Sequence, residues 1–254
     1  MATSQNTAHH TPHPQTDNLR EWIGNPTLEY LRNRRSIRKY KDIPLDWEII
    51  GELLYAGRDA PSAGNLQARK FIVITDQAKR KAVAEACFHQ YWIATAPLLI
   101  VIVAEPEKLA RFYGVRGERF YSIQECAVAA QNIIIAAQSL GLGSCFVSAF
   151  DEEDLRAVLK IPQFSRPQVV VTIGYPDEIV PEPPKYQLWD ITYLQSYGTK
   201  IRDIELYIGY NWGRDIAKAV TGLGEKIQKS GEQLEKGVSS LGSKLASYLK
   251  GEKK

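Results

Sequence analysis

Four runs of consecutive apolar residues, many of them β-branched, predict the strands of one sheet. FIVIT (71–75), LLIVIVA (98–104) and QVVVTIGYP (168–176) are the longer runs, and CFVSAF (145–150) is a shorter one. Because polar residues do not alternate with apolar ones in the longer runs, we expect a sheet that is covered on both faces.

Between these runs, apolar residues recur every three or four positions, which predicts amphipathic helices. One helix begins at Pro26 after the N-cap Asn25, and we expect its Leu28 and Leu31 to face inward. A second helix follows the N-cap Asp46. The inward stripe of this second helix comprises Trp47, Ile50, Leu53 and Leu54.

Three further segments have helical spacing. QAKRKAVAEACFHQYW (77–92) is one, and Asp151 is the expected N-cap of another, EEDLRAVL. The most apolar segment is 119–140, which Gly141 and Gly143 should end, and it belongs at the centre of the body or at a subunit interface. The alternation predicts a mixed α/β (α+β) fold, but its uneven spacing does not suggest regular βαβ repeats.

Composition adds limits to this picture. The chain has 254 residues, of which 44% are hydrophobic and 24% charged, as in an ordinary globular domain with appendages. No apolar stretch approaches the ~18 residues of a membrane-spanning helix, and the N-terminal residues lack the apolar core of a secretory signal. Cys87, Cys126 and Cys145 lie in apolar runs without a CxxC pair, so we expect buried free thiols and a cytoplasmic protein.

We expect three parts: an N-terminal arm (1–21), a body (22–200) and a C-terminal tail (201–254). The arm is polar and without periodicity, so we expect it to be disordered. It contains His9, His10 and His13, which we expect to be solvated, and no metal site is predicted.

Charge is also divided between the parts. From Gly213 to the end, nine Lys and Arg residues exceed five Asp and Glu residues, which leaves a net charge of −1 on the rest of the chain. Electrostatics therefore give no support for nucleic-acid binding by the body.

The tail has apolar residues at three-to-four spacing from Ile216 to Leu249, opposite a face of Lys, Ser and Gly. A coiled-coil contact or a membrane-surface helix that folds on binding suits this spacing. Five glycines between positions 222 and 242 favour instead a partly disordered tail in solution, because each costs a helix about 1 kcal/mol relative to Ala. Our hypothesis is conditional contact of residues 213–250 with a membrane surface or a partner, which would make the protein peripheral to the membrane.

One polar segment of the body is rich in arginine. RRSIRKY places Arg34, Arg35, Ser36 and Arg38 within five positions. Guanidinium groups and a hydroxyl suit the oxygens of a phosphate. Taken alone, the segment also fits a solvated basic face at a helix end.

A second polar segment, APSAGNLQ (60–67), lies between a predicted helix and a predicted strand. A plain turn needs one or two such residues, and this loop has a dense run of small residues and amides. The loop is therefore either an unusually polar connection or a holder of something polar.

The order RRSIRKY, APSAGNLQ, QNIIIAAQSLGLGS and GYPDEIVPEPPK resembles the FMN-dependent nitroreductase family over roughly residues 26–190. No GxGxxG or Walker loop competes as a nucleotide motif. The resemblance implies a central, mostly antiparallel sheet flanked by helices, with a long central helix at a subunit interface.

The resemblance also assigns cofactor contacts. The arginine segment would bind the phosphate of FMN, the polar loop would line the isoalloxazine ring, and Ser148 and Ala149 would bring backbone amides near N5 and O4. The residues assigned to cofactor binding are Arg34, Arg35, Ser36, Arg38, Pro61, Ser62, Ala63, Asn65, Gln67, Gly143, Ser144, Ser148, Ala149 and Lys185. Gln187 stands where many members have an arginine, so one cation is missing from the expected phosphate site.

The implied activity is that of an oxidoreductase with ping-pong logic. NAD(P)H would reduce FMN, and a small-molecule acceptor such as a nitroaromatic, a quinone or a free flavin would then be reduced in a homodimer whose two sites are each built from both subunits. No catalytic side chain is assigned, because the redox chemistry belongs to the cofactor. The alternative is a flavin-binding or scaffold protein without turnover, with the tail as its working part.

The substrate side falls in residues 105–122, a region that varies within the family and often covers the active site. The candidate contacts there are Arg111, Tyr113, Arg116, Arg119 and Phe120. An ordinary surface role for these side chains is the alternative.

Overall fold

The computed structural model describes residues 25–200. Contacts divide the chain into residues 1–183 and residues 184–254, and each unit is considered by itself. The predictions for the arm and the tail lie outside the described residues, so those parts and the boundaries at 21 and 200 stay predictions.

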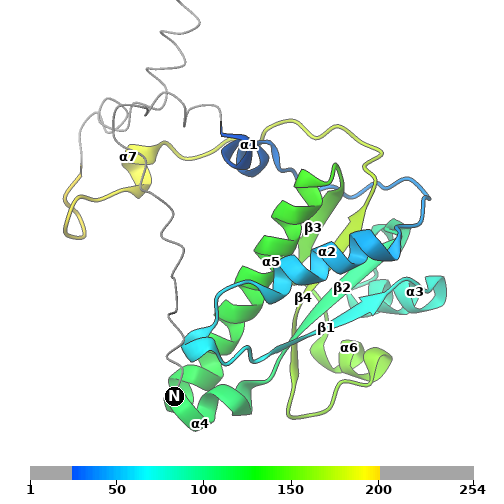
Figure 1. Cartoon of the computed structure of the whole chain (residues 1–254), viewed down its shortest axis with the longest axis horizontal. Helices are drawn as coiled ribbons and strands as arrows, with labels where there is room; N and C mark the ends of the chain where they lie inside the picture. Colours follow the sequence, from blue (N-terminus) through cyan, green and yellow to red (C-terminus); the bar gives the residue numbers. More distant parts are fainter. Residues whose placement is uncertain (1–24, 201–254) are drawn as a thin grey trace, which may run out of the picture. The chain divides into compact units, whose positions relative to one another are not determined.

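The first unit is built on one antiparallel sheet (Figure 1). The strand order is β1-β2-β4-β3, and each neighbouring pair is antiparallel. The strands are β1 (Arg69–Ile74), β2 (Leu98–Ala104), β3 (Gly143–Val147) and β4 (Arg166–Gly174). These strands confirm the four apolar runs and the mostly antiparallel sheet.

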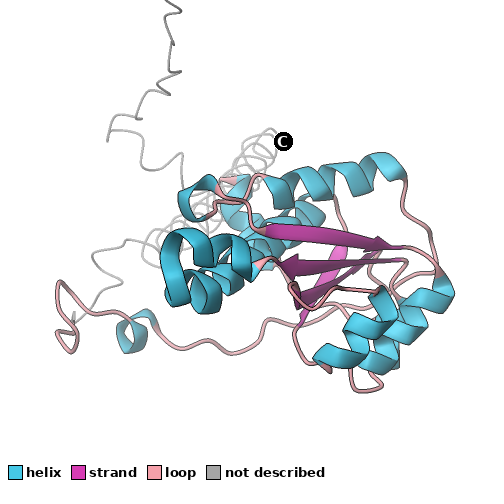
Figure 2. Ribbon diagram, turned by 90° about the horizontal axis from the view of Figure 1, so that it is seen from below, coloured by secondary structure: helices cyan, strands magenta, loops and turns pink. Residues whose placement is uncertain are grey.

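Helices cover both faces of the sheet (Figure 2). On one face, α2 (Trp47–Arg58) and α5 (Ser122–Ser139) pack over alternate β2 residues, among them Ile100. On the other face, α3 (Gln77–Ala86) and α6 (Glu152–Leu159) pack over the intervening residues, among them Val101. Every residue of β2 is buried, which explains its uninterrupted apolar sequence.

The first predicted helix forms, but it does not bury its leucines. Asn25 caps α1 (Pro26–Asn33) with a bond of 2.8 Å from Thr27 N–H to Oδ1, which confirms the cap and the place of Pro26. Leu28 and Leu31 are 38% and 44% exposed, so the prediction that they face inward is wrong. The periodicity identified an apolar face, but the described chain covers it only in part and buries no residue of α1.

The second helix differs from its prediction in the same way. Ile50 and Leu53 are buried, whereas Trp47 is 69% exposed and is not part of a buried stripe. Asp46 precedes the helix, but its side chain makes no capping hydrogen bond.

The helix predicted from 77 to 92 ends early, at Ala86. Phe88 and His89 have φ values of 55° and 56°, and left-handed residues stop an α-helix. The chain then forms the 3-10 helix η3 (Tyr91–Thr95).

The central helix begins later than its apolar sequence. Helix α4 (Pro106–Arg116) leads into a π-helical turn, η4 (Gly117–Tyr121), before α5. Gly141 follows the end of α5 with φ 73°, but Gly143 opens β3 and does not end the helix.

The remaining elements agree with the pattern. Asp151 caps α6 by accepting a bond of 2.9 Å from Asp154 N–H, and all three cysteines are buried free thiols. In the second unit, the described residues include the short helix α7 (Leu188–Ile191). No helix within 25–200 is long and apolar enough to cross a membrane.

Candidate functional site

The arginine segment lies beside the start of β3. Ser36 and Ser144 form a parallel bridge, and Ile37 N–H donates to Ser144 O at 3.0 Å. A Cβ on Gly143 would lie 2.8 Å from Ile37 Cγ1, so only glycine lets the two segments approach this closely. The fold thus joins two motifs that are more than 100 residues apart in the sequence.

Two arginines remain available at this place, which we call the phosphate end (residues 34–38 with Gly143 and Ser144). Within residues 25–200, neither Arg34 nor Arg38 forms an ion pair with a carboxylate. The Arg38 guanidinium lies 5.7 Å from the centre of the Trp92 ring. Glu178 accepts hydrogen bonds from the backbone N–H groups of Arg38 and Lys39, at 2.5 and 3.0 Å, and so fixes the segment through its backbone.

Arg35 is engaged elsewhere. Its Nη1 donates to Arg32 O at 2.7 Å and to Arg34 O at 2.9 Å, and its Nη2 lies 3.8 Å from Glu182 Oε2. With a side chain only 19% exposed, Arg35 holds the C-terminal end of α1.

A buried thiol lies next to the phosphate end. Burial raises the pKa of Cys145, and the positive charge of Arg38 and a hydrogen bond to Ser36 only partly oppose that rise. The thiol is therefore protonated at neutral pH and is a packing group, not a nucleophile.

The backbone of the polar loop, residues 60–67, has positive φ values at three positions, which explains why glycine and amide residues occur there. The 3-10 turn η2 (Ala63–Asn65) contains Gly64 at φ 54°, and Asn65 and Gln67 have φ values of 57° and 51°. Glycine and asparagine adopt this left-handed region most readily. Gln67 N–H donates to Ser62 Oγ at 3.2 Å, and Gln67 Nε2 donates to Asn65 Oδ1 at 3.2 Å.

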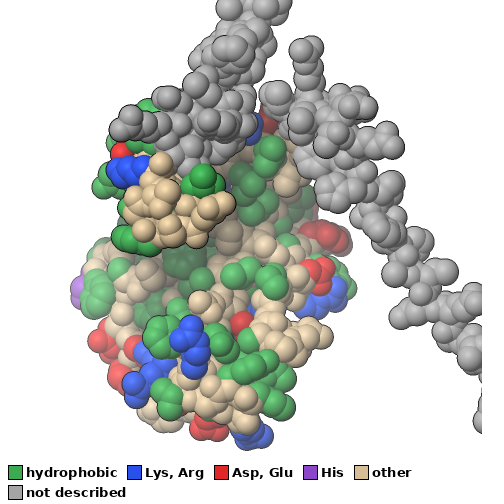
Figure 3. Space-filling model, turned by 90° about the vertical axis from the view of Figure 1, so that its left-hand side faces the viewer, with side chains coloured by type: hydrophobic (Ala, Val, Ile, Leu, Met, Phe, Trp, Pro, Cys, Tyr) green, Lys and Arg blue, Asp and Glu red, His purple; other side chains and the backbone are tan. Residues whose placement is uncertain are grey.

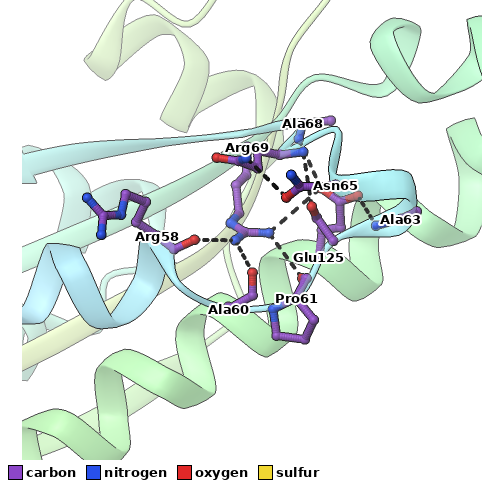
Figure 4. A network of polar contacts seen from close by, with 10 residues as sticks. Arg58, Ala60, Pro61, Ala63, Asn65, Ala68, Arg69 and Glu125 are labelled. Carbon is purple, nitrogen blue, oxygen red and sulfur yellow. Dashed lines mark hydrogen bonds and ion pairs between the residues drawn. The ribbon is translucent and has the colours of Figure 1, made fainter. Parts of the chain in front are cut away.

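A buried ion pair anchors this loop to the core (Figure 4). Glu125, in the first turn of α5, accepts from Ala63 N–H on Oε1 and from Ala68 N–H on Oε2, both at 2.9 Å. Arg69 Nη1 lies 3.8 Å from Glu125 Oε2, and the two side chains are 2% and 3% exposed. The Arg69 guanidinium also donates to three carbonyl oxygens at the loop entrance, those of Arg58, Ala60 and Pro61.

Neither Arg69 nor Glu125 was among the residues predicted for the site. A signal for them exists, because each is a charged residue next to or inside one of the most apolar segments of the chain. What the sequence does not show is that residues 56 positions apart meet and share the same loop.

The segment predicted to contact the substrate, residues 105–122, also packs against the polar loop. The Tyr113 hydroxyl occupies the space that a Cβ on Gly64 would need, and Tyr113 meets Tyr121 edge to face at 5.3 Å. Figure 3 shows this face, whose lower part, formed by α4 and the π-turn, exposes hydrophobic side chains beside Lys and Arg. The exposed large hydrophobic residues of these two elements are Phe112, Tyr113, Val115 and Phe120.

The phosphate end and the loop lie at opposite ends of α5 (Figure 1). The loop is bonded to Glu125 in the first turn of this helix, whereas Gly143 follows its last residue, Ser139, by four positions. Ser139 lies 14 positions after Glu125, which corresponds to about 21 Å of helix at 1.5 Å per residue. Within one chain, the arginine segment and the polar loop are therefore separated by about the length of this helix.

The remaining residues predicted to bind the cofactor lie outside the phosphate end and the polar loop. Ser148 and Ala149 are exposed just after β3, and Ala149 O accepts from Gln90 Nε2 at 3.2 Å. Lys185 and Gln187 belong to the second unit, so they are not placed against the phosphate end. Residues 25–200 contain no group of three or more His, Cys, Asp or Glu side chains that could hold a metal ion.

Comparisons with known proteins agree with this architecture. The sequence model of the nitroreductase family matches residues 31–92 and 86–175. The NADH dehydrogenase of Thermus thermophilus is 31% identical over 172 residues, covering 57% of this chain and 84% of the relative. The oxygen-insensitive NADPH nitroreductase of Salmonella typhimurium is 27% identical over 208 residues, covering 75% and 87%.

A solved structure has the same fold. The FMN-dependent nitroreductase of Clostridium difficile superposes with a TM-score of 0.57 at 29% identity, covering 67% of this chain and 99% of that chain. Since the family model spans more than half of the sequence, and the antiparallel sheet and its flanking helices agree with it, the chain belongs to the nitroreductase family.

Proposed function

We propose that this protein is an FMN-dependent oxidoreductase, which takes reducing equivalents from NAD(P)H and passes them to a small-molecule acceptor. Its site would be formed twice in a homodimer, each time from the phosphate end of one protomer and the loop of its partner. The observation that carries this proposal is the separation of the two half-sites by the length of α5 in a single chain.

The phosphate end fits the phosphate of FMN. Two arginines that have no carboxylate partner within residues 25–200 flank a close backbone approach that only Gly143 permits. Guanidinium groups bind phosphate oxygens with paired, charge-assisted hydrogen bonds. We assign phosphate binding to Arg34, Ser36 and Arg38. Arg35 instead stabilises the segment through its hydrogen bonds to the end of α1.

The loop fits a planar ring. Its first five residues, 60–64, have small side chains, and the ion pair beneath fixes the backbone, so a flat partner can approach closely. We assign ring contacts to Pro61, Ser62, Ala63 and Asn65, with Gln67 orienting the Asn65 amide.

A two-fold dimer unites the half-sites. If two α5 helices pack antiparallel, the loop at the start of one lies next to the phosphate end at the end of the other, and symmetry produces two equal sites. The exposed Leu28 and Leu31 of α1 would then belong to the subunit interface, which is where uncovered apolar side chains are expected.

The chain's own residues bind and orient in this reaction. FMN supplies the redox chemistry when it is bound, by accepting a hydride from NAD(P)H and passing electrons to an acceptor such as a nitroaromatic, a quinone or a flavin. We propose that donor and acceptor use the same face in turn, giving ping-pong kinetics. Tyr113 and the neighbouring exposed side chains of α4 would cover that face and limit the access of water.

Subunit mixing tests this arrangement. One variant, Arg38→Ala, weakens the phosphate end of its protomer, and the other, Ala63→Trp, fills the ring wall of its protomer's loop. If each site uses both protomers, heterodimers of the two variants retain one intact site and bind FMN, which NAD(P)H bleaches anaerobically. Heterodimers without flavin, or a wild-type protein that FMN does not reconstitute, would contradict the proposal. Bound FMN that NAD(P)H does not bleach would indicate a flavin-binding protein without turnover.

A further inference from the structure

The pair formed by Arg69 and Glu125 differs from an ordinary surface ion pair. Both side chains are almost fully buried, and their hydrogen bonds to other residues go to the backbone of the polar loop and its entrance. Glu125 fixes two N–H groups, and Arg69 fixes three carbonyl groups. The pair is therefore organised around the shape of the loop.

We propose that Glu125 is a positioning residue of the flavin site, acting through the amides of Ala63 and Ala68, with Arg69 as its charge partner. This inference rests on the proposed function, because the loop is where the ring would lie. Neither side chain reaches the surface of the loop, so neither would touch the flavin.

The geometry explains why a carboxylate is required. Ala63 N–H and Ala68 N–H donate to different oxygens of one carboxylate, each at 2.9 Å. A carboxylate offers acceptors only, so both amides are satisfied at once. A glutamine would turn an NH₂ group toward one of them and leave Arg69 without its counter-charge.

The two hydrogen bonds of Glu125 also determine which part of the loop stays unanchored. The residues between the two bonded amides include the three left-handed positions, Gly64, Asn65 and Gln67. With both ends of this tip held to the first turn of α5, the helix sets how far the tip projects. Because the loop is where the ring of FMN would lie, Glu125 would set the depth at which the ring meets its wall.

The test begins without flavin. In the apo-protein, Glu125→Gln should speed hydrogen exchange of the Ala63 and Ala68 amides by at least about tenfold, because each loses or weakens its buried acceptor. The double variant Arg69→Met/Glu125→Met removes the charges together and keeps the volume, which guards against simple unfolding. It should show the same faster exchange at these two amides, with normal protection in β2 and β4.

The flavin readouts follow on the reconstituted dimer. Both variants should bind FMN more weakly by about tenfold or more, and the midpoint potential and visible circular dichroism of the bound flavin should change, since its ring wall is displaced. The matched control is Glu152→Gln, which breaks an ion pair to the buried Arg156 on α6. It should leave all these readouts as in the wild type.

Each outcome has one meaning. If the two amides keep their protection in the variants, or if FMN affinity, potential and dichroism stay at wild-type values while the loop exchanges faster, the positioning role is refuted. Equal changes in Glu152→Gln would also refute it, since general loss of stability would then be the cause. A wild-type protein that does not bind FMN would refute the proposed function instead, and the apo-protein exchange would still test the anchor.

Discussion

Ile37 donates its backbone N–H to Ser144 O at 3.0 Å, and its side chain lies against Gly143. This contact fixes the arginine segment on the end of the sheet. Since β3 pairs with β4 along its whole length and four of its five residues are buried, the arginine segment lies on an ordered support, as a phosphate site would require.

Gly143→Ala tests this close approach. The new Cβ would lie 2.8 Å from Ile37 Cγ1, so the segment must shift, and we expect a loss of about 1–3 kcal/mol in the free energy of unfolding by urea. Retention of FMN should fall as well. Gly51→Ala, in α2 with no atom within 4 Å of the new Cβ, should instead stabilise the protein by roughly 0.5–1 kcal/mol. Equal effects of both changes would show that the close approach is unimportant.

Gly64→Ala tests the contact between the loop and α4. The substitution places a side chain at φ 54° and in the space of the Tyr113 hydroxyl, so we expect a loss of about 1–2 kcal/mol. Tyr113→Phe removes the hydroxyl, and the double variant should recover part of the loss. A double-mutant cycle on the free energies of unfolding measures this coupling, and strict additivity would contradict the contact.

Arg38→Ala and Arg35→Ala should affect different properties. Arg38 has no carboxylate partner among the described residues, so its loss should weaken FMN binding by about 10- to 100-fold through a lost charge-assisted contact. Arg35 caps the end of α1, so its loss should lower thermal stability more than Arg38→Ala does. Fluorescence titration with FMN and thermal melts distinguish the two. Arg111→Ala, on the exposed face of α4, should leave FMN affinity unchanged.

The sequence predicted the strands well, because an apolar β-branched run is a local signal that the core of a sheet requires. It also predicted the caps Asn25 and Asp151, where side chain and amide are close neighbours in the chain. It could not predict that Leu28 and Leu31 stay exposed, since periodicity identifies an apolar face and not what covers it.

For the site too, the sequence indicated local segments but not all of the contacts between them. The arginine segment lies beside Gly143 and Ser144, which open β3, and the resemblance assigned both groups to cofactor binding without placing them together. The anchor of the loop depends on Arg69 and Glu125 meeting across the fold, and the separation of the loop from the arginine segment depends on the length and placement of α5. Both are tertiary relationships, which no local pattern of residues records.

The three thiols should be unreactive in the native protein. Burial raises the pKa values of Cys87 and Cys126 to about 12, and it also raises the pKa of Cys145. Ellman's reagent should therefore titrate all three only after denaturation. Because these folded-state pKa values lie above those of the unfolded chain, their contribution to stability is complete at neutral pH and is lost as the pH rises above about 9. Rapid labelling at pH 7 would contradict this.

Glu152 should make stability sensitive to acid. Hydrogen bonding to Arg166 lowers the pKa of this carboxyl below its ordinary value of 4.5, and Arg156 adds to the effect. A carboxyl whose folded-state pKa is depressed stabilises the protein above its unfolded pKa, and that contribution is lost as the pH falls through the folded pKa. The free energy of unfolding, measured in urea, should therefore fall more steeply below pH 4.5 for the wild type than for Glu152→Gln, which has no carboxyl to protonate at this position. Parallel curves for the two proteins would show that the triad with Arg156 and Arg166 contributes nothing to acid stability.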